Sequence, residues 1–215
     1  MTDADDVLDS VARYYSDRLE AHGATPLGVD WSSEDSQQLR FTQLLRVIEG
    51  ETPTIIDYGC GYGALAQRLI AEGRDFRYVG FDVSASMVGA AQSLIEDPRC
   101  RFTTDEDDLG RADFTLASGI FNVRLQTGES DWHDYVTATC DRIAGCSTRG
   151  FALNMLTRYA DPPLMRDDLY YADPSRYFAL CKERYSRNVA LLHDYDLYEF
   201  TLLVRLGAAP TAVAS

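Results

Sequence analysis

The feature that constrains this chain most is the stretch over residues 55–63, where a short apolar run breaks into three alternating glycines. A helical pattern over residues 64–70 follows directly. Glycine tolerates the positive φ that a tight turn needs, and without a Cβ it lets a ligand approach the backbone. The first N–H groups of the helix are free to meet that ligand. The pattern predicts a strand, a turn and a helix start that together form a cofactor site.

The glycine spacing by itself leaves two kinds of cofactor open. Gly59, Gly61 and Ala64 also satisfy the G-x-G-x-x-A form of the dinucleotide fingerprint. Asp57 lies two positions before the first glycine, where a carboxylate repels a pyrophosphate and attracts an amino group. Asp82 ends the next apolar run, at the distance expected for an acid that binds ribose hydroxyls. The two acids together favour a cofactor that carries an ammonium group and a ribose.

The two motifs resemble those of the class I S-adenosylmethionine-dependent methyltransferases. The first motif of that family, D/E-x-G-x-G-x-G, is present as residues 57–63, and its second-strand acid with the following D-x-S-x-x-M is present as residues 82–87. The resemblance covers about residues 53–206. It implies an α/β, Rossmann-like fold with a seven-stranded, mostly parallel sheet, a C-terminal antiparallel hairpin and helices on both faces. It also implies that the cofactor is S-adenosyl-L-methionine.

The hydrophobic pattern agrees with that architecture. It predicts strands near residues 53–58, 76–82, 99–104, 112–118, 149–156, 188–194 and 198–206, and helices near residues 63–73, 84–97, 129–145 and 174–185. Such alternation is typical of a parallel sheet covered on both faces. The turn between the last two strands is too short for a crossover, so we expect these strands to be antiparallel neighbours.

The segment before the first strand forms a separate part of the predicted organisation. We expect residues 1–52 to be a helical lid and residues 53–207 to be the methyltransferase domain. Amphipathic helices are predicted over residues 4–21 and 33–49. In small-molecule methyltransferases such segments commonly cover the acceptor, so Tyr15, Trp31 and Arg40 are candidates for contacting it. Simple packing of these helices on the domain is the alternative.

Charge and composition narrow the class of partner. The formal net charge of −14 argues against a nucleic-acid partner, which needs a basic face. No apolar run approaches the roughly 20 residues of a membrane span, and the acidic start of the chain is unlike a signal peptide. We therefore expect a cytoplasmic protein. We also expect a monomer or homodimer. The five cysteines include no C-x-x-C pair, so we predict no metal site.

Further cofactor contacts are expected at the ends of the third and fourth strands. The resemblance suggests that Asp105 contacts the adenine amine, whereas the acids that follow it are predicted to be solvated. Ser118 and Gly119 should lie beside the transferable methyl group, because ligands bind at the carboxyl ends of parallel strands. The predicted cofactor-binding residues are Asp57, Gly59, Cys60, Gly61, Gly63, Asp82, Val83, Met87, Asp105, Ser118 and Gly119.

The acceptor site is less well marked in the sequence. Residues 157–173 form a long loop rich in aromatic side chains, and such loops in compact domains are usually functional. Arg158 and Arg166 could hold a carboxylate or phosphate through bidentate hydrogen bonds, or could be tied to neighbouring aspartates. The predicted substrate-binding residues are Trp31, Arg40, Asn122, Arg158, Tyr159, Arg166 and Tyr171.

Catalysis of methyl transfer depends mainly on holding the two reactants together. A general base is needed only when the acceptor must lose a proton, and His193 and Asn122 are the candidate catalytic residues. The predicted activity is transfer of a methyl group to an oxygen or nitrogen of a small organic metabolite that carries a ring or an acidic group. A nicotinamide-dependent oxidoreductase and a catalytically silent S-adenosylmethionine-binding protein remain as alternatives.

Overall fold

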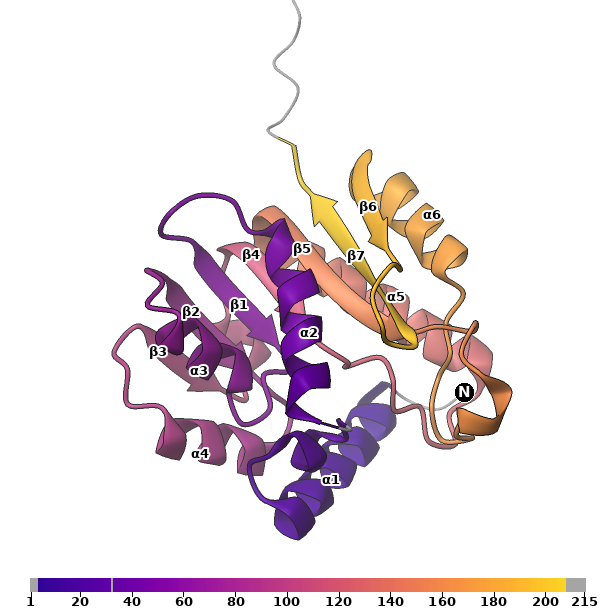
Figure 1. Ribbon diagram of the computed structural model, residues 1–215, viewed down its shortest axis with the longest axis horizontal. Coiled ribbons are helices and arrows are strands. Elements are labelled where there is room, and N and C mark those ends of the chain that lie inside the picture. The colour runs from indigo at the N-terminus through magenta and orange to yellow at the C-terminus, as the bar shows by residue number, and fades with distance from the viewer. Residues whose placement is uncertain (1–3, 32, 208–215) are drawn as a thin grey trace, which may run out of the picture.

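A computed structural model of the chain describes residues 4–31 and 33–207 (Figure 1). Seven strands form one sheet in the order β3-β2-β1-β4-β5-β7-β6. The strands are β1 (Thr54–Tyr58), β2 (Arg77–Phe81), β3 (Cys100–Thr103), β4 (Ala112–Ala117), β5 (Ser147–Leu156), β6 (Asn188–Leu192) and β7 (Glu199–Arg205). The α-helices are α1 (Ala4–His22), α2 (Glu34–Leu44), α3 (Ala64–Ala71), α4 (Ala85–Leu94), α5 (Glu129–Cys146) and α6 (Pro174–Arg184).

The strand pairing confirms the predicted fold class. β1 pairs in parallel with β2 on one side and with β4 on the other, so the strand order reverses between β1 and β4. β7 pairs antiparallel with both β5 and β6, and it is inserted between them. The carboxyl ends of β1, β2 and β4 therefore meet at one edge, beside the point of reversal, where open parallel sheets bind ligands.

Each face of the sheet has its own hydrophobic core. Ile55 and Ile56 are adjacent on β1 and belong to different clusters, because successive strand residues point to opposite faces. The cluster around Ile55 includes Leu65 of α3, and the cluster around Ile56 includes Trp132 of α5. Burying a leucine or isoleucine side chain contributes about 1.5–3 kcal/mol. The sheet is thus held rigidly from both sides, which fixes the positions of the strand ends.

Several element ends differ from the prediction. α2 begins after Ser33, whose side chain accepts a hydrogen bond from the backbone N–H of Ser36 at 3.1 Å, and the α-helix ends at Leu44 rather than near residue 49. The chain continues as a 3₁₀ turn, Leu45–Val47. β6 ends at Leu192, so His193 lies outside the strand. Within the part of the chain that the structure describes, no helix is long and apolar enough to cross a membrane.

The loop over residues 157–173 is bound to the end of the sheet. The N–H of Tyr170 donates to the carbonyl of Asn122 at 2.8 Å, and the N–H of Arg158 donates to the carbonyl of Ala172 at 2.9 Å. The ring of Tyr170 is buried against Trp132. The ring of Tyr170 completes the core beside α5, so this aromatic side chain of the loop is not available to an acceptor.

Candidate functional site

The glycine turn after β1 has the geometry that its sequence predicts. The N–H groups of Gly59 and Cys60 both donate to the carbonyl of Phe81, at 2.7 and 2.8 Å, so the turn is tied to the end of β2. Gly59 has φ 83° and Gly63 has φ 83°, which is the left-handed region that favours glycine. A Cβ on Gly59 would lie 2.2 Å from Cγ2 of Ile120. The backbone at Gly59 is thus in direct contact with the loop after β4.

Asp82 joins the turn to the start of α4. Its Oδ2 accepts from the N–H of Gly61 at 2.9 Å, and its Oδ1 accepts from the N–H of Ser84 at 2.9 Å. Burial raises the pKa of Asp82, whereas the N–H groups of Ser84 and Gly61 act in the opposite direction. Each oxygen has only one of these partners, so the carboxylate can still accept hydrogen bonds from a ligand.

Asp57 is a second buried carboxylate beside the turn. Its Oδ2 accepts from the hydroxyl of Tyr78 at 2.5 Å. Burial raises the pKa of Asp57 to about 7, with a further contribution from the charge of Asp82, and the Tyr78 hydroxyl opposes the rise. A cation placed near both acids would favour their ionised forms. The turn therefore offers two carboxylates that lack a positive partner among the described residues.

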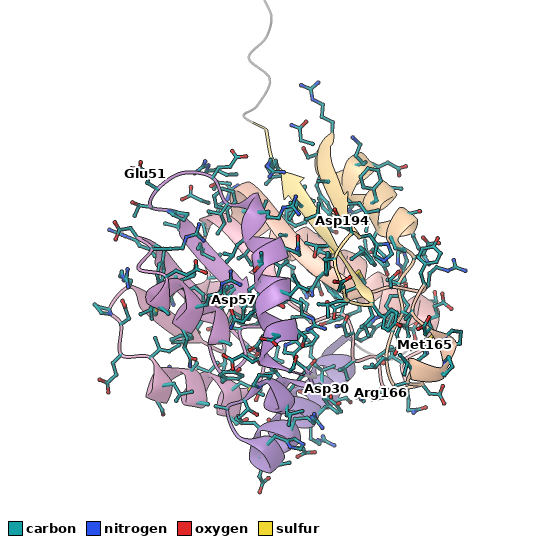
Figure 2. The ribbon with its side chains drawn as sticks, viewed as in Figure 1. Asp30, Glu51, Asp57, Met165, Arg166 and Asp194 are labelled. Atoms are coloured by element: carbon teal, nitrogen blue, oxygen red, sulfur yellow. The ribbon has the colours of Figure 1, made fainter. Side chains whose placement is uncertain are left out.

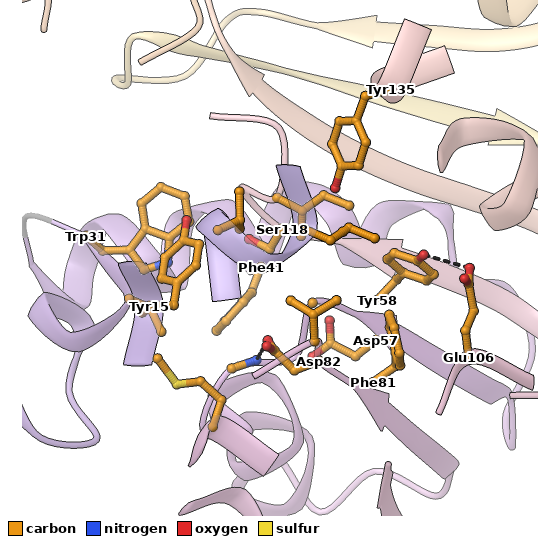
Figure 3. A pocket seen from close by; sticks show the side chains of 18 residues that line it. Tyr15, Trp31, Phe41, Asp57, Tyr58, Phe81, Asp82, Glu106, Ser118 and Tyr135 are labelled. Atoms are coloured by element: carbon orange, nitrogen blue, oxygen red, sulfur yellow. Dashed lines mark hydrogen bonds between the residues drawn. The ribbon is translucent and has the colours of Figure 1, made fainter. Parts of the chain in front are cut away.

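A cavity runs along these strand ends (Figure 3) and has about 930 Å³ of empty space, counting the part open to solvent. Figure 3 shows Tyr15 and Trp31 at one end of this first cavity and Glu106 and Tyr58 at the other. Asp57 and Asp82 lie between the two ends. The predicted cofactor residues that line it are Asp57, Gly59, Gly61, Asp82, Val83, Met87 and Ser118.

The residues of the first cavity fit S-adenosylmethionine. Asp82 offers acceptors for ribose hydroxyls, and Asp57 offers a carboxylate for the ammonium of the methionine part. Val83 and Met87 supply an apolar wall for an adenine ring. The hydroxyl of Ser118 is buried without a hydrogen-bond partner among the described residues, and it lines the cavity near the carboxyl end of β4. A pocket with a few polar groups on an apolar lining is typical of cofactor sites.

Four predicted cofactor residues lie outside the lining of the first cavity. Gly63 has a packing role, because a Cβ there would lie 2.6 Å from Cδ1 of Ile95 and the Ile95 side chain would have to shift. The thiol of Cys60 is buried and directed at the carbonyl of Gly61. Asp105 is exposed, and its Oδ1 accepts from the N–H of Asp107 at 3.0 Å. Gly119, the fourth, contacts Trp31 instead.

Glu106, predicted to be solvated, is the acidic residue that lines the far end of the first cavity. Its Oε1 accepts from the hydroxyl of Tyr58 at 2.7 Å, and Arg142 lies 3.8 Å away. The 3₁₀ turn Glu106–Asp108 turns Asp105 outward and Glu106 inward. Nothing in the sequence of the four consecutive acids, residues 105–108, indicates which one faces the first cavity.

A second cavity of about 500 Å³, counting space open to solvent, adjoins the first. The two share Tyr15, Val29 and Trp31 as walls. The second cavity lies toward β5 and β7, since Leu156 and Glu199 also line it. Of the predicted substrate residues, those that line it are Trp31, Arg40, Asn122 and Arg166.

Trp31 is held in place by a buried polar network. A Cβ on Gly119 would lie 2.3 Å from the indole ring, so only glycine leaves room for it. The guanidinium of Arg40 stacks on the indole at 3.9 Å, and its Nε donates to Oε1 of Glu199 at 2.7 Å. Asn154 donates to the other carboxylate oxygen of Glu199 at 2.6 Å and accepts from the N–H of Gly119 at 2.8 Å. The network joins α2, β7, β5 and the end of β4.

The remaining predicted acceptor and catalytic residues are not brought to either cavity. Arg158 is exposed and pairs with Asp173 at 2.9 Å. Tyr159 is 66% exposed, and its ring faces His193, which is also exposed. Tyr171 accepts from the N–H of Arg166 through its hydroxyl. His193 follows β6, the edge strand, which is three positions from β4 in the sheet, so the position of its strand places it too far from the reversal point.

Arg166 and Asn122 reach the second cavity but are already engaged. Arg166 forms a bidentate pair with Asp168, at 3.0 and 2.6 Å, and also contacts Asp30. The Oδ1 of Asn122 accepts from the N–H of Leu156 at 3.1 Å. Sequence reasoning missed Glu199, although an acid at the start of an apolar strand is a signal of a buried charge pair.

Comparisons with known proteins agree with this geometry. The profile of a family described as a methyltransferase domain matches residues 55–142. A Mycobacterium tuberculosis protein named as a methyltransferase, Rv1506c, is 50% identical over 167 residues, which are 75% of this chain and 98% of that protein. The magnesium protoporphyrin IX methyltransferase of Synechocystis PCC 6803, solved with S-adenosylmethionine, has a TM-score of 0.63 at 16% identity over 96% of this chain and 98% of that chain.

Human N-acetylserotonin methyltransferase, also solved with S-adenosylmethionine, has a TM-score of 0.68 at 15% identity over 96% of this chain and 61% of that chain. These two structures share the fold of this chain, and the sequence relative shares its family. The family decides between the two cofactors that the glycine spacing left open, and against a nicotinamide-dependent oxidoreductase. The chain belongs to the class I S-adenosylmethionine-dependent methyltransferases, and its cofactor is S-adenosylmethionine.

Proposed function

We propose that this enzyme transfers a methyl group to an oxygen or nitrogen of a small organic acceptor that binds in the second cavity. The observation that carries the proposal is the shared wall of Tyr15, Val29 and Trp31 between the two cavities. A ligand in the first cavity and a ligand in the second would both contact these three side chains, and so would lie next to each other. The second cavity combines an apolar and aromatic lining with a few polar groups, which is typical of small-molecule sites.

The protein's contribution is to bind and orient the two reactants. When bound, the cofactor supplies an electrophilic methyl group on a sulfonium. Asp57 and Asp82 hold the cofactor's polar ends, and Ser118 and the turn after β4 lie beside the wall between the cavities. Correct placement of this kind supplies much of the rate acceleration in group transfer.

Proton removal by a protein side chain is not part of the proposal. The carboxylates that line the second cavity are Asp30 and Glu199, and each is paired with an arginine. Both carboxylates are thus already bound by guanidinium groups in this arrangement. The acceptor is therefore proposed to react through a lone pair that is free at neutral pH, or to lose its proton to solvent.

The lid is the third part of the proposal. The N-terminal segment before β1 contributes Tyr15, Val29 and Trp31 to the walls, and the loop over residues 157–173 contributes Arg166. Residues 1–52 are proposed to close over the acceptor as a lid on the methyltransferase domain, residues 53–207. Of residues 1–52, the structure describes residues 4–31 and 33–52.

Incubation with a metabolite extract and trideuteromethyl-labelled cofactor tests this function. The expected result is a labelled compound of low molecular mass, absent with the Asp82→Asn variant. A label found only in protein or nucleic acid would contradict the small-molecule acceptor. Titration calorimetry with S-adenosylhomocysteine and with NAD checks the cofactor separately, and binding of NAD alone would contradict the cofactor assignment.

A further inference from the structure

The guanidinium of Arg40 is buried and one of its donors is unused. Its side chain is 7% exposed, its Nε and Nη2 both donate to Oε1 of Glu199, and its Nη1 has no hydrogen-bond partner among the described residues. A buried donor without a partner is destabilising, because it has lost its hydrogen bonds to water. Such a cost inside an otherwise satisfied network points to a partner that arrives with a ligand.

The network around Arg40 leaves no acceptor for this donor. Oε1 of Glu199 takes both bonds from Arg40, and Oε2 accepts from Asn154 at 2.6 Å. The face of the guanidinium is covered by Trp31, at 3.9 Å from the ring centroid. Trp31 is in turn fixed against Gly119. Arg40 is therefore held rigidly, and its spare N–H groups cannot turn toward another protein oxygen without breaking the pair with Glu199.

The place of Arg40 identifies which ligand it serves. Arg40 lines the second cavity and is absent from the lining of the first. The first cavity contains Asp57, Asp82 and the glycine turn, which are assigned to the cofactor. The other arginine of the second cavity, Arg166, has its fork occupied by Asp168. The amide nitrogen of Asn122, which also lines this cavity, has no acceptor among the described residues. The unused polar groups are donors, so the matching ligand group is an oxygen acceptor.

We propose that Arg40 is the specificity residue for the methyl acceptor, and that its Nη1 donates to a carboxylate oxygen of that acceptor in the second cavity. The inference rests on the proposed function for the identity of the second cavity. It narrows the substrate class to small organic acids. An uncharged analogue with an amide in place of the carboxylate would lose the charge-assisted hydrogen bond, which is about twice as strong as a neutral one.

The experiment uses acetate as the probe, because it is a minimal carboxylate and carries the proposed recognition group whatever the rest of the acceptor is. The protein is saturated with S-adenosylhomocysteine, and the dissociation constants of acetate and acetamide are measured by NMR titration at matched ionic strength. We expect the wild type to bind acetate at least fivefold more tightly than acetamide. The Arg158→Met variant, which changes an exposed arginine outside both cavities, should behave like the wild type.

The test variant is the double change Arg40→Met with Glu199→Met, which removes the buried pair together and so avoids an unpaired buried carboxylate. Replacing a buried ion pair by apolar side chains is often neutral for stability. Arg40→Lys, which keeps the charge beside Glu199 but removes the fork, is the second variant if the double one fails to fold. The double variant should bind acetate and acetamide equally weakly, and Arg40→Lys should bind acetate less tightly than the wild type. Both should bind S-adenosylhomocysteine within about twofold of the wild type.

Two results would overturn the proposal. One is equal binding of acetate to the wild type and to the folded variants. The other is a loss of tenfold or more in S-adenosylhomocysteine affinity in the variants, with acetate and S-adenosylhomocysteine competing, because Arg40 would then serve the cofactor's carboxylate. Neither result depends on turnover, so a failure here is distinct from a failure to find a methylated product.

Discussion

The side chains of Asp30 and Arg166, 136 residues apart in the sequence, meet with 3.0 Å between Oδ2 and Nη1 (Figure 2). Asp30 has a positive φ of 61° and also accepts from the hydroxyl of Tyr14 at 2.9 Å. Arg166 is anchored in its own loop by Asp168. The contact joins the N-terminal segment to the loop over residues 157–173, and Asp30 and Arg166 both line the second cavity. It therefore connects the proposed lid to the loop that lines the same cavity.

Loss of this contact is expected to loosen the lid without unfolding the protein. Arg166 is 45% exposed, so Arg166→Met should lower the free energy of unfolding by less than about 1 kcal/mol. Hydrogen exchange should become faster in residues 26–31 and 157–173. Arg158→Met breaks an exposed pair within one loop and is the matched control. Unchanged exchange in the Arg166 variant would mean that the two segments are held by packing alone.

Asp82 and Asp105 are expected to differ sharply in their effect on cofactor binding. Asp82 is buried in the lining of the first cavity, and Asp105 is exposed outside it. Hydrogen bonds to a charged group contribute about 1.5–3 kcal/mol each, so Asp82→Asn should weaken S-adenosylhomocysteine binding by about tenfold or more. Asp105→Asn should change it by less than about threefold. Calorimetric titration of both folded variants measures this, and equal affinities would show that the ribose acid is wrongly assigned.

The pKa of Asp57 predicts how cofactor affinity varies with pH. That pKa is raised from 3.8 to about 7 by burial, so the carboxyl must lose a proton before it can pair with the cofactor's ammonium. Affinity for S-adenosylhomocysteine should therefore rise about tenfold between pH 6 and the plateau, and fall again where the ligand's amino group loses its proton, at about pH 8. Asp57→Asn should remove the rise on the acid side. An unchanged profile in that variant would assign the titration to another group.

The same raised pKa has a consequence for the stability of the cofactor-free protein. Folded Asp57 binds its proton more tightly than unfolded Asp57, so its contribution to stability is fully present below about pH 4. That contribution is lost as the pH rises through about 7. The Asp57→Asn variant should lose less stability than the wild type between pH 5 and about pH 7. Thermal melts across this range check the sign, and a steeper loss in the variant would contradict it.

Alanine substitutions at Gly63 and Gly73 distinguish the cost of backbone strain from the cost of side-chain crowding. Both have positive φ, 83° and 65°, so an alanine at either position pays about 1–2 kcal/mol for the left-handed conformation. A Cβ on Gly63 would also lie 2.6 Å from Ile95, whereas a Cβ on Gly73 would have no neighbour within 4 Å. Gly63→Ala should therefore be the more destabilising change, by about 1–3 kcal/mol beyond Gly73→Ala. Denaturant unfolding of both variants measures the difference, and equal losses would show that the Ile95 side chain can move aside.

Local sequence patterns were sufficient to predict most of the fold. The apolar runs before Gly59 and Asp82 are strands because each is short and ends at a turn, and Ser33 starts α2 because its hydroxyl can cap the helix. The antiparallel pair β6 and β7 follows from the short turn between them. Each of these is a property of neighbouring residues, so the sequence alone was sufficient. The cofactor turn and the carboxylates Asp57 and Asp82 were predictable for the same reason.

The lining of the second cavity, the proposed acceptor site, depends on tertiary contacts that the sequence does not reveal. Arg40 and Glu199 are 159 residues apart, and nothing local in either segment says that one will neutralise the other. Asp105 and Glu106 are adjacent acids, and only the 3₁₀ turn decides which one faces the first cavity. Tyr170 joins the core and His193 stays exposed because of the neighbours that the fold brings to them. By itself the sequence predicted the glycine turn and the carboxylates Asp57 and Asp82, since these lie within one strand–turn–helix unit and the strand beside it. The second cavity, which is the proposed acceptor site, is lined by segments far apart in the sequence that come together only in the folded protein.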